Sequence, residues 1–85
     1  MKDLIIELTD DFFEIMKQND RKKFDSVLVA YDGDEVSFWE DCEEELMNHG
    51  KLPYAICYLE WVAETNADLR EKANALIEKL KVFEE

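Results

Sequence analysis

Apolar residues recur three or four positions apart along much of this chain, the spacing of one face of an α-helix. The first such pattern covers residues 3–18 and consists of Ile5, Leu8, Phe12, Ile15 and Met16, with acidic residues on the other side. The last follows a capping sequence at residues 65–68 and consists of Leu69, Ala73, Leu76, Ile77, Leu80 and Phe83. Both segments are predicted to be amphipathic helices.

Residues 20–39 allow two interpretations. Asp20 suits an N-cap, and the helical pattern after it consists of Phe24, Val27, Leu28 and Tyr31. Gly33 suits the left-handed residue just after a helix. The alternative is a β-hairpin over residues 27–39 with its tight turn at Asp32 and Gly33. We favour the helix because Phe24 extends the 3.6-residue pattern backwards and residues 40–47 form helix strongly.

Two more helices are predicted after this region. Asp34 can cap a helix over residues 35–48, whose apolar stripe would be Val36, Trp39, Cys42 or Glu43, Leu46 and Met47. Pro53 suits the first position of the next helix, which is apolar almost all round over residues 54–64. Such a helix is usually the central one. We place Trp39 and Trp61 in the core and expect Phe38 and Tyr54 to be more exposed.

The expected fold is therefore all-α, a single helical domain over residues 1–85 with four to five short helices. The alternative is an α+β fold with the hairpin at residues 27–39. Hydrophobic residues make up 47% of the chain and aromatic residues 12%, too much for a disordered acidic tail. No apolar run approaches the roughly 20 residues of a membrane span, and the N-terminus does not look like a signal peptide. Cys42 and Cys57 are predicted to be reduced core thiols of a cytoplasmic protein, and a disulfide between them is the alternative.

The charge distribution points to a partner. The net charge is −12, and residues 24–69 hold twelve acidic residues and a single base, Lys51. Such a one-sided field favours a basic protein and disfavours nucleic acid or an anionic membrane. Like charges four residues apart, such as Glu40 and Glu44, cost about a few tenths of a kcal/mol per pair with no structural gain. We therefore favour a functional role for these acids over solubility alone.

Catalysis and metal binding have little support in the sequence. The single histidine, His49, is expected at a helix end, and no glycine-rich loop is present to hold phosphate. Four acids stand at the first, third, ninth and twelfth places of a calcium-loop frame: Asp32, Asp34, Glu40 and Glu43. However, Val36 and Ser37 occupy the places that require an oxygen ligand and a glycine. We expect no enzyme, no cofactor and no specific metal site.

The candidate partner-binding residues are the acids of residues 32–45 together with two neighbouring aromatic residues. They are Asp32, Asp34, Glu35, Phe38, Glu40, Asp41, Glu43, Glu44, Glu45 and Tyr54. Carboxylates beside aromatic rings suit a partner rich in lysine and arginine, through electrostatic steering and hot-spot contacts.

Two resemblances follow from these residues. Residues 52–65 and 67–80 resemble an antiparallel helix pair of HEAT-like repeats, and residues 67–73 followed by Ala75 and Leu76 are similar to the second helix of such a repeat. The small single domain, the lack of catalytic residues and the concentrated acidity resemble bacterial immunity proteins and antitoxins. That resemblance implies an inhibitor that neutralises a basic nuclease-type toxin by occluding its nucleic-acid-binding site. The alternatives are a small adaptor or regulatory subunit that binds through apolar helix faces, and an acidic DNA mimic or weak divalent-cation binder.

Overall fold

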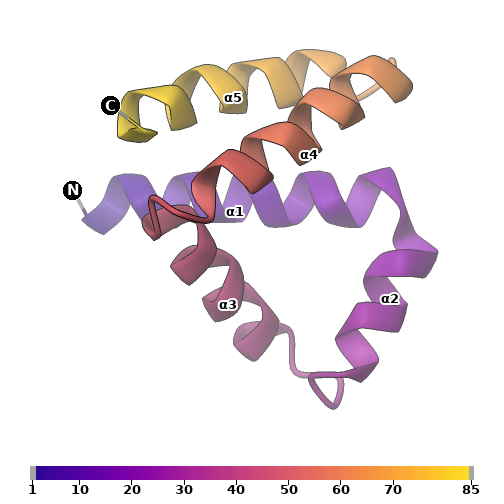
Figure 1. Cartoon of the computed structure of the whole chain (residues 1–85). Coiled ribbons are helices and arrows are strands. Elements are labelled where there is room, and N and C mark those ends of the chain that lie inside the picture. Colours follow the sequence, from indigo (N-terminus) through magenta and orange to yellow (C-terminus); the bar gives the residue numbers. More distant parts are fainter. Residues whose placement is uncertain (1, 85) are drawn as a thin grey trace.

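The computed structural model describes residues 2–84, and the side chains of residues 4–82, as an all-α fold without strands. Its helices are α1 (Lys2–Asn19), α2 (Arg21–Val29), α3 (Glu35–Met47), α4 (Leu52–Thr65) and α5 (Arg70–Glu84). Figure 1 shows α4 and α5 running side by side in opposite directions along one side of α1. On the other side, α2 and α3 extend away from α1 and meet at the turn that joins them.

The central helix is α1, which contacts α2, α3 and α5, whereas α4 packs mainly on α5 and less on α3. The prediction that α4 is central was therefore wrong. Its inner face is buried, but its outer face carries Tyr54, Cys57 and Trp61, which are exposed. Trp61 is 52% exposed, so its placement in the core was also wrong, as was that of Cys57. The reason is geometric: one neighbour on each of two sides cannot cover the whole circumference of an apolar helix.

Residues 20–39 form helices and not a hairpin, and contacts at the helix ends explain why. The Asp20 side chain accepts a hydrogen bond from the backbone N–H of Lys23 (3.1 Å) and so begins α2. Asp32 and Gly33 both have left-handed backbone, with φ of 57° and 79°, and the N–H of Gly33 donates to the carbonyl of Leu28 (3.0 Å). The Asp-Gly pair therefore ends a helix, and the hairpin alternative is wrong.

A cluster of aromatic rings fills the core between α1, α2 and α3. The ring centroid of Phe38 lies 5.1 Å from Phe13, 5.2 Å from Phe24 and 5.1 Å from Tyr31. Phe38 is only 8% exposed, which contradicts its prediction as a surface residue. The buried stripe of α3 is Phe38, Cys42 and Leu46, so Val36 and Met47 of the predicted stripe face solvent and Trp39 is partly buried.

The first and last helices, α1 and α5, follow their predicted patterns. Ile5, Leu8, Phe12 and Ile15 of α1 are buried, and so are Leu69, Ala73, Leu76, Ile77 and Leu80 at and within α5. The side chain of Phe83 lies outside the described side chains. Asn66 organises the turn before α5, because its side-chain oxygen accepts from the N–H groups of Asp68 (3.1 Å) and Leu69 (3.3 Å). Among the described helices, none is long and apolar enough to cross a membrane.

Candidate functional site

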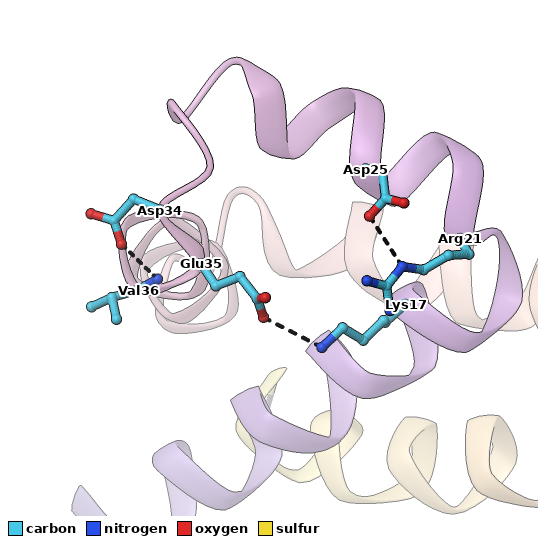
Figure 2. A network of polar contacts seen from close by, with 6 residues as sticks. All are labelled: Lys17, Arg21, Asp25, Asp34, Glu35 and Val36. Carbon is cyan, nitrogen blue, oxygen red and sulfur yellow. Dashed lines mark hydrogen bonds and ion pairs between the residues drawn. The ribbon is translucent and has the colours of Figure 1, made fainter.

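The acids predicted to bind a partner lie on the α2–α3 turn and along α3, but some of them have partners within the chain. Asp34 is the N-cap of α3: its carboxylate accepts from the N–H groups of Val36 (3.0 Å) and Ser37 (3.4 Å). Glu35 accepts from the ammonium of Lys17 at 3.3 Å, which ties the start of α3 to α1. Figure 2 shows the contact of Asp34 with Val36 and that of Glu35 with Lys17. These two carboxylates therefore have structural roles.

Figure 2 also shows a second ion pair, between Arg21 and Asp25 on α2, with 3.1 Å between Nε and the carboxylate. Both members are exposed, so the pair contributes at most about 1 kcal/mol. Within the side chains of residues 4–82, neither ion pair involves an acid of residues 40–45.

Asp41 connects α3 to the end of α2. It accepts a hydrogen bond from the hydroxyl of Tyr31, whose ring stacks on Phe38 with an interplanar angle of 5°. The pKa of Tyr31 is raised to about 12, mainly because its hydroxyl donates to Asp41 and further by desolvation and by the negative charges of Asp41 and Glu45. Since ionised tyrosine would lose this bond, the contact holds the α2–α3 turn only while Tyr31 is protonated.

The remaining acids of α3 form an exposed group. Glu40, Glu43 and Glu44 make no hydrogen bond or ion pair with the side chains that the structure describes. Together with Asp41, Met47 and Asn48, they line an open depression on the second half of α3. We call this the acidic depression. Met47 is 61% exposed, so the depression combines negative charge with a flexible apolar side chain.

The helix itself adds to the negative field of the acidic depression. The last turn of α3 contains no lysine or arginine, and the C-terminal end of a helix carries a partial negative charge. Carboxylates in this position are unfavourable by about 0.3–1 kcal/mol each. A cation from a partner would remove this cost, and the chain supplies none on α3.

Glu45 is partly buried beside the acidic depression. Burial raises the pKa of its carboxyl group above the ordinary value, and the positive charge of Lys51 offsets part of that effect. Its ionised form is therefore less favourable in the folded chain than in water.

The two aromatic residues of the predicted site differ in their exposure to solvent. Tyr54 is 72% exposed, as expected, whereas Phe38 belongs to the core. Sequence reasoning missed Trp61, which lies on the same outer face of α4 as Tyr54 and Cys57. Its ring centroid is 6.0 Å from that of Tyr58, which in turn lies 6.0 Å from Phe12. Apolar residues surround α4, so no spacing in the sequence singles out Trp61; the structure buries Ile56, Leu59 and Ala63 on the opposite side of the helix.

Within residues 4–82, the calcium-loop frame and the carboxylates around it would form a metal centre only if several of these side chains converged on one point. No group of three or more histidine, cysteine, aspartate or glutamate side chains is placed to hold a metal ion within the described part of the chain. The calcium-loop frame at residues 32–43 is not a loop, because α3 begins at Glu35 and points successive side chains around a helix.

No protein-family model, curated protein or solved structure matches this chain. The inference of function therefore rests on the arrangement of its own side chains.

Proposed function

We propose that this protein binds and inhibits a basic protein, most concretely as a bacterial immunity protein or antitoxin against a nuclease-type toxin in the cytoplasm. The observation that carries the proposal is the acidic depression. Glu40, Glu43 and Glu44 are exposed or partly exposed and lack partners among the described side chains, and Glu44 lies in the last turn of α3, at its negative end. They can bind lysine and arginine without breaking any internal contact.

The proposed mechanism is occlusion of the partner's nucleic-acid-binding site. The carboxylates would bind the basic side chains that otherwise bind phosphate, while the exposed Met47 of the depression provides apolar contact. Asp34, Glu35 and Asp41 have internal bonds and hold α3 in place instead. The net charge of −12 would steer the partner before contact.

Charge reversal at matched positions tests this proposal. The partner is captured from the native host with the tagged chain, identified by mass spectrometry and purified. The first variant carries Glu40→Lys, Glu43→Lys and Glu44→Lys. The control carries Glu60→Lys, Glu64→Lys and Asp68→Lys, which are three exposed positions outside the acidic depression. Both variants change the net charge equally.

We expect the first variant to lose inhibition of the partner's nuclease activity and the control to retain it. The expected loss of affinity is about tenfold or more for each buried contact, since like charges across an interface cost several kcal/mol. Equal effects of the two variants would mean that only net charge matters, and the acidic depression would not be the binding site.

A second candidate function, an adaptor or regulatory subunit, is favoured by the exposed outer face of α4. Tyr54 and Trp61 are large, amphipathic side chains of the kind enriched at interfaces. In that case Trp61→Ala would weaken binding of the captured partner strongly, and the reversal of Glu40, Glu43 and Glu44 would leave it largely intact.

A further inference from the structure

We draw no further inference here: the strongest candidate, the exposed outer face of α4 formed by Tyr54, Cys57 and Trp61, carries none beyond the second candidate function, because nothing in the described part of the structure shows what covers it.

Discussion

Replacing Phe38 by alanine tests the aromatic core. Phe38 lies in that core, although the sequence analysis predicted an exposed side chain. Phe38 is buried against Phe13, Phe24 and Tyr31, with centroids 5.1–5.2 Å away. Phenylalanine-to-alanine changes in cores cost about 3–5 kcal/mol. A chain of 85 residues has a free energy of unfolding of about 4–13 kcal/mol, at roughly 0.05–0.15 kcal/mol per residue. Phe38→Ala should therefore remove a large share of the total stability.

Urea unfolding followed by helical circular dichroism measures this loss. Tyr54→Ala is the matched control, because Tyr54 is an exposed aromatic residue on a neighbouring helix and should change stability by no more than about 0.5 kcal/mol. If Phe38→Ala does not fold, the milder Phe38→Leu should still lower the unfolding midpoint measurably. A cost below about 1 kcal/mol for Phe38→Ala, or an equal cost for Tyr54→Ala, would refute the assignment of Phe38 to the core.

Three further predictions concern single residues. Gly33→Ala should lower the free energy of unfolding in urea by about 1–2 kcal/mol, because φ is 79° at this position and alanine is strained there. An added Cβ would meet no atom within 4 Å, so a steric clash would not contribute. An unchanged urea midpoint would therefore refute backbone strain at Gly33. Burial raises the pKa of Glu45, so its contribution to stability is present below the ordinary value of 4.5 and is lost as pH rises through the folded value. Glu45→Gln should therefore raise the melting temperature at pH 7 but not at pH 3, unlike the exposed control Glu44→Gln, and a pH-independent effect would contradict this cause. Burial also raises the pKa of the Cys42 thiol to about 12, so a thiol reagent at pH 8 should label Cys57 rapidly and Cys42 only after unfolding. The Cys57→Ser variant should then show no rapid reaction. Rapid labelling of that variant would contradict the burial of Cys42.

The helices were predictable because their signals are local. Asp20 and Asp34 each cap the helix that follows within three residues, and the left-handed backbone of Asp32 and Gly33 allows the Gly33 N–H to bond the Leu28 carbonyl at the end of α2. These contacts depend on neighbouring residues alone, so a sequence pattern can express them.

The buried side of a helix was less predictable, because it depends on where other helices lie. On α3 the predicted and the observed apolar stripes share Leu46, but the buried face is rotated about the helix axis. Phe38 therefore faces inward and Val36 outward. On α4 the apolar residues surround the helix, so the pattern gives no direction and Trp61 was misplaced. The contacts of α4 with α5, α3 and α1 select its inner face.

The sequence predicted which acids belong to the candidate site, but not which of them have structural contacts within the chain. The contact of Tyr31 with Asp41 spans ten positions and that of Lys17 with Glu35 spans eighteen. No local pattern reveals such pairs, so the sequence could not distinguish acids that hold the fold from acids available to a partner.

The association rate constant as a function of ionic strength tests the central claim most directly. Stopped-flow mixing with the purified partner, from about 0.01 M to 1 M salt, shortens the Debye length from roughly 30 Å to 3 Å. We predict a steep fall of the rate constant for the unmodified chain and a much weaker salt dependence after Glu40→Lys, Glu43→Lys and Glu44→Lys. The control reversal at Glu60, Glu64 and Asp68 should keep most of the salt dependence. A rate constant that does not change with salt would contradict binding through the acidic depression.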